Sequence, residues 1–162
     1  MTIKDKVIRY GDDINTDVII AGKYTKTFSI ETLAQHAMED LDRDFTTKIK
    51  QASIIVGGSY FGCGSSREAA PIALKAAGVS CIFAKTFARI FYRNAINIGL
   101  PIVECNTDNI HEGDVLVYEL GSDTVVNETT GERLKTQPLP DIMLDIFKCG
   151  GLVEYFRQTG GY

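Results

Sequence analysis

Along the first two thirds of the chain, short continuous apolar runs alternate with segments in which apolar residues are spaced three or four positions apart. Short apolar runs bounded by turn residues predict strands at residues 7–10, 18–21, 53–56, 79–84 and 102–104. Between several of these runs, apolar residues recur every three or four positions, which is the spacing of one helix face. Strands that alternate with helices in this way indicate an α/β fold.

Three helices are expected in this first part. Ser29 precedes the first helix as its N-cap, and the second helix tolerates Pro71 near its first turn and ends at Gly78. Thr86 is expected to cap the third helix, which ends at Gly99. The apolar face of the first helix consists of Ile30, Leu33, Ala34, Ala37, Met38 and Leu41, and that of the third of Phe87, Ile90, Phe91, Ala95 and Ile98.

The last third of the chain has a different pattern. Residues 115–120, 124–127 and 133–136 are strand-like and are joined by short turns, which predicts a meander or a pair of hairpins. Two short helical pieces, residues 141–148 and 152–157, are split by a pair of glycines. Since no repeat or linker interrupts the chain, we expect one α/β domain over residues 1–162 with a mixed sheet flanked by helices.

Composition and charge narrow the class of protein. The 162 residues are 44% hydrophobic and 23% charged, as in a globular protein, and the net charge is −4. This mild acidity gives no electrostatic reason to expect nucleic acid or an anionic membrane as a partner. The longest apolar run is far shorter than the roughly 20 residues of a membrane helix, and residues 2–6 lack the apolar stretch of a secretory signal. These features predict a soluble, cytoplasmic protein.

The cysteines and histidines do not suggest a metal site. Cys63, Cys81, Cys105 and Cys149 form no CxxC pair, and neither of the two histidines lies within metal-ligand spacing of them. We expect the last three cysteines to be buried structural thiols. No metal is therefore expected on this chain.

The candidate chemistry is concentrated in residues 57–68, between a predicted strand and a predicted helix. Four glycines there allow a backbone to approach a ligand closely, while Ser65, Ser66 and Arg67 can hold an anion. The alternative is a structural turn whose serines only cap the helix. The segment lacks the Gly-Lys-Ser/Thr ending of a P-loop and the third glycine of a dinucleotide site. Cys63 is a further candidate, as a nucleophile, although no base is evident beside it.

Three ordered motifs give the chain a specific resemblance. They are residues 13–20 (Asp-Ile-Asn-Thr-Asp-Val-Ile-Ile), 60–71 (Tyr-Phe-Gly-Cys-Gly-Ser-Ser-Arg-Glu-Ala-Ala-Pro) and 85–91 (Lys-Thr-Phe-Ala-Arg-Ile-Phe). Together they resemble the swivelling β/β/α domain of the aconitase superfamily, and the match covers nearly the whole chain. A free-standing domain of this length is typical of the small subunits of isopropylmalate dehydratases and homoaconitases.

The resemblance implies a hydro-lyase that is active only with a large subunit, as a heterodimer or a heterotetramer. That partner would hold a [4Fe-4S] cluster, and this chain would bind no cofactor. The reaction would move a hydroxyl between neighbouring carbons of a dicarboxylate or tricarboxylate substrate by dehydration and rehydration. By motif position, Ser65 matches the catalytic base, Ser66 and Arg67 match residues that hold substrate carboxylates, and Asp17 matches an acid that contacts the large subunit's catalytic groups. Asp17 could instead form only an Asx turn.

The substrate is less closely defined by the resemblance. Residues 24–27 match a loop that contacts the variable group of the substrate, and Lys26 places a cation there. An isopropyl group, as in the isopropylmalate of leucine biosynthesis, favours an apolar surface, whereas homoaconitate, a citramalate or a dimethylmalate becomes plausible if Lys26 points inward. Lys26 could also be an ordinary solvated lysine. In a different class of function, the chain would be a non-catalytic carboxylate-binding or assembly module.

Overall fold

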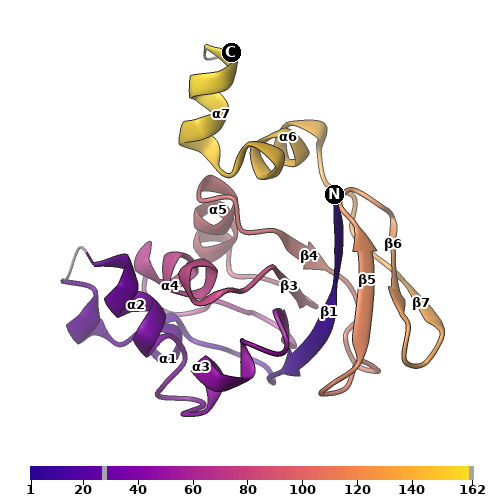
Figure 1. Ribbon diagram of the computed structural model, residues 1–162, viewed down its shortest axis with the longest axis horizontal. Helices are drawn as coiled ribbons and strands as arrows, with labels where there is room; N and C mark the ends of the chain where they lie inside the picture. The colour runs from indigo at the N-terminus through magenta and orange to yellow at the C-terminus, as the bar shows by residue number, and fades with distance from the viewer. Residues whose placement is uncertain (27–28, 161–162) are drawn as a thin grey trace.

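The chain folds around one mixed sheet, seen in a computed structural model that describes residues 1–26 and 29–160 (Figure 1). Among these residues the strands follow the order β4-β3-β2-β1-β5-β6-β7. Strands β1 to β4 are parallel and β5 to β7 continue the sheet in antiparallel fashion. The strands are β1 (Thr2–Arg9), β2 (Ile54–Val56), β3 (Cys81–Ala84), β4 (Ile102–Glu104), β5 (Val115–Glu119), β6 (Thr124–Asn127) and β7 (Glu132–Lys135). The α/β class with a mixed sheet is thus confirmed.

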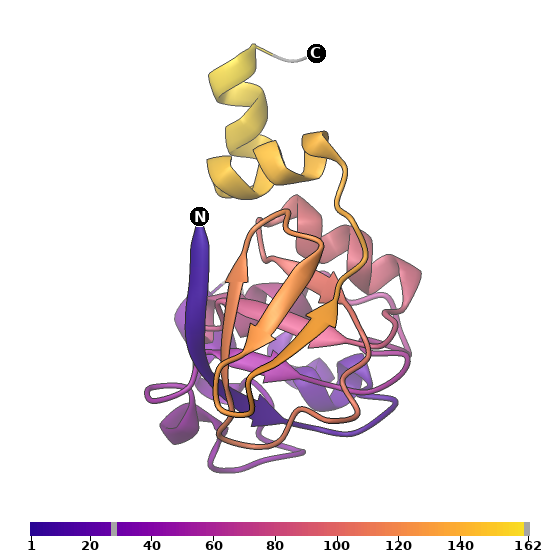
Figure 2. The same ribbon diagram turned by 90° about the vertical axis from the view of Figure 1, so that its right-hand side faces the viewer.

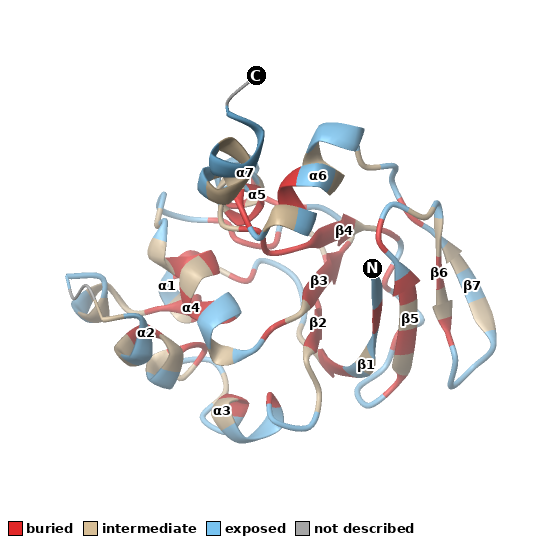
Figure 3. Ribbon diagram, turned by 45° about the horizontal axis from the view of Figure 1, so that its top comes forward, coloured by how far each residue is buried: buried red, intermediate tan, exposed pale blue. Residues whose placement is uncertain are grey.

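Strand β1 joins the two halves of the sheet. Its carboxyl-terminal part pairs in parallel with β2, with Val7 opposite Ile54. Its amino-terminal part pairs antiparallel with β5, with Thr2 opposite Glu119. Every residue of β2 and β3 is buried, which is the pattern expected of parallel strands covered on both faces (Figure 3).

Helices surround the parallel half of the sheet. In Figure 1, α1, α2 and α4 lie on the left of the parallel strands, and the β5–β7 meander lies on the right. The last two helices stand at the top of the molecule in Figures 1 and 2. The helical elements are α1 (Thr16–Ile19), η1 (Gly22–Tyr24), α2 (Ile30–His36), α3 (Phe45–Lys48), α4 (Ala69–Ala77), α5 (Arg89–Asn97), α6 (Asp141–Cys149) and α7 (Leu152–Thr159). None of the helices in the described part of the chain is both long enough and apolar enough to cross a membrane.

The strand predicted at residues 18–21 is wrong. Residues 16–19 form helix α1, because the side chain of Asn15 accepts a hydrogen bond from the backbone N–H of Asp17 at 2.8 Å and caps the first turn. A four-residue apolar run fits either a buried strand or a buried helix turn. The strand predicted at residues 7–10 is present but begins five residues earlier, at Thr2, because residues 2–6 pair with β5. The remaining predicted strands are present within two residues of their expected ends.

The first predicted helix is present but shorter than expected. Ser29 caps it as predicted, accepting from the backbone N–H of Thr32 at 3.2 Å. The helix ends at His36, and Met38 takes a left-handed φ of 61° while its N–H donates to the carbonyl of Ile19 at 2.8 Å. Leu41 is consequently 44% exposed rather than part of a helix face. The predicted stop of α4 at Gly78 is confirmed by its φ of 116°.

Candidate functional site

The three motifs meet at the carboxyl ends of the parallel strands. The N–H of Gly62 donates to the carbonyl of Ile14 at 2.8 Å, which joins the first motif to the loop of residues 57–68. The N–H of Phe61 donates to the carbonyl of Thr86 at 3.0 Å, which joins the same loop to the third motif. In parallel α/β sheets this edge is where ligands bind.

Two glycines of the loop are required by close packing. Gly62 has a φ of +83°, and a Cβ there would lie 2.2 Å from the ring of Phe91. Gly64 has a φ of +92°, and a Cβ there would lie 2.5 Å from the side-chain oxygen of Asn15. Both positions therefore combine a left-handed backbone with no room for a side chain.

Asp17, Ser65 and Arg67 come together at this edge. The Oδ1 atom of Asp17 lies 2.8 Å from Nη2 of Arg67 and accepts a hydrogen bond from Oγ of Ser65 at 3.3 Å. Asp17 is in the first turn of α1, and the other two residues are in the loop before α4. One carboxylate oxygen thus binds both a hydroxyl and a guanidinium, while the Asp17 side chain stays 56% exposed to solvent.

Arg67 is held closely on one side and open on another. A Cβ at Gly22 would lie 2.9 Å from Nη1 of Arg67, so the guanidinium lies directly against the backbone at the start of η1. Its Nε is buried and has no hydrogen-bond partner among the described residues. A buried, unpaired N–H of a guanidinium is costly, and a carboxylate ligand offers the matching pair of oxygens.

Thr16 fixes the backbone of the proposed base and was missed by sequence reasoning. Its hydroxyl donates to the carbonyl of Ser65 at 2.8 Å, and its N–H donates to the carbonyl of Cys63 at 2.8 Å. Thr16 is only 2% exposed. Its position within the first motif was the only signal in the sequence, because both bonds cross between segments about 50 residues apart.

A cavity of about 240 Å³ lies between the loop and helix α5. Ser65, Ser66 and Arg67 line one wall, and Arg89 and Asn94 of α5 belong to the other. Its full lining is Thr16, Tyr60, Gly62, Gly64, Ser65, Ser66, Arg67, Phe87, Ala88, Arg89, Ile90, Phe91 and Asn94. The predicted anion-binding residues therefore share one cavity with a further arginine.

Tyr60, which lines this cavity, is bonded to Thr86 in a way the sequence did not predict. Thr86 does not cap α5, which has Ala88 as its N-cap with no side-chain bond; instead, the Thr86 hydroxyl accepts from the N–H of Tyr60 at 2.7 Å. Tyr60 holds a left-handed φ of 59° and is 53% exposed. A non-glycine residue in this conformation stores strain, and such strain often occurs at functional sites.

Lys26 lies apart from these residues. It is exposed, follows η1, and is not among the described residues that line the cavity. Thr27, which completes the predicted substrate loop of residues 24–27, lies outside the described residues.

The cysteines do not fit an iron–sulfur cluster. Burial raises the pKa of the Cys81 thiol, and it raises the pKa of Cys105 to about 12. Cys149, predicted to be buried, is only half-buried, with Sγ 3.3 Å from the side-chain oxygen of Gln158. Across residues 1–26 and 29–160, no three His, Cys, Asp or Glu side chains are grouped so that they could hold a metal ion.

Cys63 is poorly suited to act as a nucleophile. It is buried, and burial together with the nearby Asp13 carboxylate raises the pKa of its thiol. The thiolate is the reactive form of cysteine, so a raised pKa lowers its reactivity at neutral pH.

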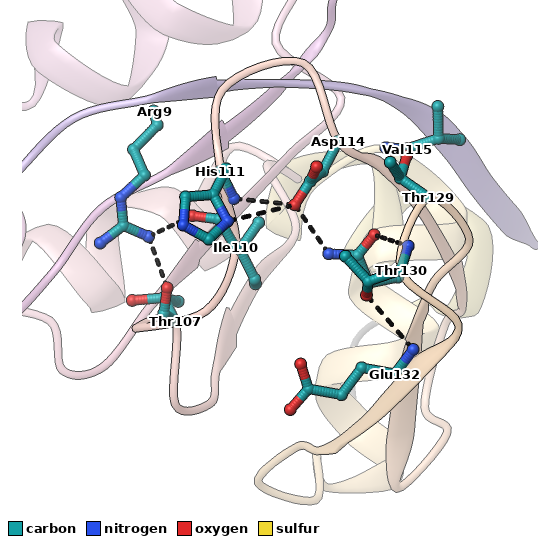
Figure 4. Close-up of polar contacts among 10 residues, drawn as sticks. Arg9, Thr107, Ile110, His111, Asp114, Val115, Thr129, Thr130 and Glu132 are labelled. Atoms are coloured by element: carbon teal, nitrogen blue, oxygen red, sulfur yellow. Dashed lines mark hydrogen bonds and ion pairs between the residues drawn. The ribbon is translucent and has the colours of Figure 1, made fainter.

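A polar network contacts the start of the loop at Gly57, and Figure 4 shows the part of it that includes Arg9, Thr107 and Asp114. The hydroxyl of Thr107, which is fully buried, donates to the carbonyl of Gly57 at 2.7 Å. The guanidinium of Arg9 in turn donates to the carbonyls of Thr107 and Ile110. Farther along, the carboxylate of Asp114 accepts from the backbone N–H of His111 at 2.8 Å. The network links the end of β1 to the site loop through groups that are mostly buried.

Comparison with known proteins identifies the relatives of this arrangement. Residues 9–107 match the model of the aconitase C-terminal domain. The chain is 52% identical over 158 residues to the 3-isopropylmalate dehydratase small subunit of Caldanaerobacter subterraneus subsp. tengcongensis, covering 96% of this chain and 98% of that protein. It is 49% identical, over 96% of this chain and 94% of the relative, to the isopropylmalate/citramalate isomerase small subunit of Methanocaldococcus jannaschii.

A solved structure gives the same result for the fold. The crystal structure of a 3-isopropylmalate dehydratase from Methanocaldococcus jannaschii superposes with a TM-score of 0.93 at 42% sequence identity. The match covers 99% of this chain and 96% of that one.

Proposed function

The chain belongs to the aconitase C-terminal domain family, and from that premise we propose that it is the small subunit of a 3-isopropylmalate dehydratase. It is a hydro-lyase subunit that, with a large subunit, interconverts 2-isopropylmalate and 3-isopropylmalate in leucine biosynthesis. The resemblance assigns a [4Fe-4S] cluster to the large subunit, where it would supply the binding site for the substrate hydroxyl. This division agrees with the chemistry of the four cysteines of this chain.

The observation that carries the proposal is the meeting of Ser65 and Arg67 at one oxygen of Asp17. We assign Ser65 as the base that takes a proton from the substrate carbon and returns it to the other carbon. A serine hydroxyl is too weakly acidic to do this unaided, so its alkoxide needs nearby cations and N–H donors. Arg67, with Nη2 2.8 Å from the carboxylate that Ser65 contacts, can supply such a cation.

Arg67 and Ser66 are proposed to hold a carboxylate of the substrate. The guanidinium is fixed against Gly22, and its unpaired Nε favours an incoming anion. Since Ser66 lines the same cavity and is exposed, its hydroxyl is available to the same ligand. Asp17 is proposed to leave this pair when substrate binds and to meet the catalytic groups of the large subunit.

The wider assembly is proposed on the same basis. Residues 1–162 form one swivelling domain that docks on the large subunit as a heterodimer or a heterotetramer. The four free thiols support a reducing compartment, and we place the complex in the cytoplasm.

Anaerobic reconstitution tests the proposal. This chain is mixed with a cluster-bearing large subunit and assayed on a panel of substituted malates, with each subunit alone as the control. Turnover of isopropylmalate by the mixture only is the expected result. A formed complex with an intact cluster that turns over none of the acids would instead favour a non-catalytic carboxylate-binding or assembly module.

A second substrate is favoured by one observation. The Methanocaldococcus jannaschii relative is named for citramalate as well as isopropylmalate. We therefore include citramalate, dimethylmalate and homoaconitate in the panel. If Lys26 selects an acid with an additional carboxylate, Lys26→Leu lowers the kcat/KM for homoaconitate and raises or preserves that for isopropylmalate. Unchanged selectivity would exclude a role for Lys26.

A further inference from the structure

Arg89 is an arginine without a partner beside the proposed active site. It lines the cavity of about 240 Å³ that also contains Ser65, Ser66 and Arg67. It is exposed, and the structure gives its guanidinium no ion pair or hydrogen bond with any described residue. Arg67, in contrast, is already paired with Asp17 at 2.8 Å.

The position of Arg89 relative to the site loop is fixed by the backbone. The N–H of Ala88, the residue before it, donates to the carbonyl of Phe61 at 2.9 Å. The ring of Phe91, two residues after it, contacts Gly62 so closely that no Cβ fits between them. These two contacts, one before and one after Arg89, hold the start of α5 against the loop.

The charge of the cavity fits an acid with more than one carboxylate. The carboxylate of Asp17 offsets one guanidinium, so the second arginine leaves the site with a surplus positive charge. The chain as a whole carries a net charge of −4, so this surplus is local. A guanidinium binds a carboxylate in bidentate fashion, and two arginines on different walls can hold two carboxylates of one small molecule.

We propose that Arg89 is a second carboxylate-binding residue of the active site, which holds the substrate carboxylate that is not bound by Arg67. The inference rests on the proposed function, since it names a further contact to the same dicarboxylate. Arg89 would act from the helix wall and Arg67 from the loop wall, so that the substrate is oriented across the cavity toward Ser65.

The test compares Arg89→Ala with Arg93→Ala in the reconstituted enzyme. Arg93 is a matched control, since it is an exposed arginine one turn along the same helix and does not line the cavity of about 240 Å³, although both arginines line a neighbouring cavity beside Glu104. We expect Arg89→Ala to raise the KM for isopropylmalate by about tenfold to a hundredfold, as for loss of a hydrogen bond to a charged group. Arg89→Lys should give an intermediate KM, because it keeps the charge but loses the bidentate geometry. Arg93→Ala should stay within about twofold of wild type, as a surface substitution does.

Two results would overturn the inference while the wild-type complex remains active. One is a KM of Arg89→Ala that equals that of wild type. The other is a normal KM at saturating large subunit together with weaker subunit association, measured by titration of the two chains, which would make Arg89 a contact to the partner.

A second measurement covers the case in which the wild-type complex does not turn over isopropylmalate, so that the proposed function itself fails. The ¹⁵N-labelled full chain is titrated with malate and followed by NMR. Weaker malate binding in Arg89→Ala, but not in Arg93→Ala, supports the carboxylate contact. Equal affinities in all three chains refute it.

Discussion

Ser65 and Arg67 depend on the same atom, the Oδ1 of Asp17, although they reach it from a different segment of the chain. A nearby carboxylate makes ionisation of a hydroxyl less favourable, whereas a nearby guanidinium makes ionisation of the hydroxyl more favourable. While Asp17 is in place, its carboxylate contacts both groups and opposes formation of the Ser65 alkoxide. Removal of the Asp17 carboxylate from the pair by substrate binding would leave Ser65 beside a cation, which is the setting that an alkoxide needs.

Ser65→Ala is predicted to reduce turnover by about 10²–10⁴-fold, which is the contribution of a general base. Folding and association with the large subunit should be unchanged, because Ser65 is exposed and the Thr16 bond is made to its backbone. Steady-state kinetics of the reconstituted enzyme measures the effect. Ser59→Ala, in the same loop, is the control, and near-native turnover by Ser65→Ala would remove this residue as the base.

Gly62→Ala is predicted to be much more damaging than Gly113→Ala. The two glycines have nearly equal φ angles, +83° and +84°, so the backbone strain of an alanine is similar, roughly 1–3 kcal/mol. Only at Gly62 would the new Cβ collide with another group, the ring of Phe91, whereas Gly113 has open space around it. Urea unfolding of both variants measures the difference. Equal losses of stability would show that the loop can move away from α5.

At the scale of the elements, the apolar pattern predicts the strands and most helices, because buried strands such as β2 and β3 require continuous apolar runs. It fails at residues 16–19, where a local cap from Asn15 starts a helix, and it fails again where a tertiary hydrogen bond decides the conformation. Met38 ends α2 by donating its N–H to Ile19, and Thr86 accepts from Tyr60 instead of capping α5. Such partners lie far away in the sequence, so no local pattern reports them.

The sequence predicts the site, like the elements, only where no contact between distant segments decides the role of a residue. Its motifs contain the residues that the structure brings together, Asp17, Ser65 and Arg67, because each motif lies at the end of a parallel strand or in the turn that follows it. Thr16 and Arg89 were inside the same motifs, but their roles depend on contacts between motifs. Residue type and spacing alone do not distinguish these two from their neighbours.

We predict that the hydrogen bonds of Asp42, which connect the end of β1 with helix α3, are sensitive to acid. Its Oδ2 accepts from the hydroxyl of Tyr10 at 2.8 Å and from Nζ of Lys48 at 2.9 Å. Burial opposes its ionisation, but the bonds from Lys48, Tyr10 and the Asp44 N–H outweigh it, so the pKa of Asp42 lies below its usual value. The stabilisation is therefore complete above about pH 4, the unfolded pKa, and is lost as the pH falls through the lower folded pKa.

Asp42→Asn should consequently lower the free energy of unfolding by about 1–3 kcal/mol at pH 7, the range for hydrogen bonds to a charged group. The gap from wild type should shrink as the pH falls from 4 to 2. Urea unfolding at several pH values measures it. The control is Asp40→Asn, an exposed carboxylate two residues away. A gap that is constant with pH would contradict the assignment.

At the scale of the whole molecule, helices α6 and α7 stand at the top of the fold (Figure 2), and α6 packs against it through the buried side chains of Ile146 and Phe147. Nζ of Lys75 in α4 donates to the carbonyl of Ile98 at 2.5 Å and to that of Gly150 at 3.2 Å. Gly99 lies so close to Gly150 that a Cβ added to Gly99 would be 2.5 Å from the carbonyl carbon of Gly150. One lysine thus bridges the ends of two helices, α5 and α6.

Lys75→Met is predicted to loosen α6 and α7 without unfolding the sheet. Two backbone carbonyls would lose their donor, so amide hydrogen exchange in residues 141–159 should rise, while exchange in β2 and β3 stays slow. Hydrogen exchange followed by mass spectrometry measures this directly. Lys50→Met, at an exposed lysine, is the control. Equal protection of α6 and α7 in both variants would show that Lys75 does not hold them.

The divided pairing of β1 has a consequence for how the chain folds during synthesis. The part of β1 that pairs with β2 meets residues such as Ile54 soon after translation begins, but the part that contains Thr2 must wait for Glu119. At roughly 5–20 residues per second, that interval lasts several seconds. The part of β1 that contains Thr2 therefore stays unpaired until β5 has been synthesised, although its neighbour in the same strand is already able to pair.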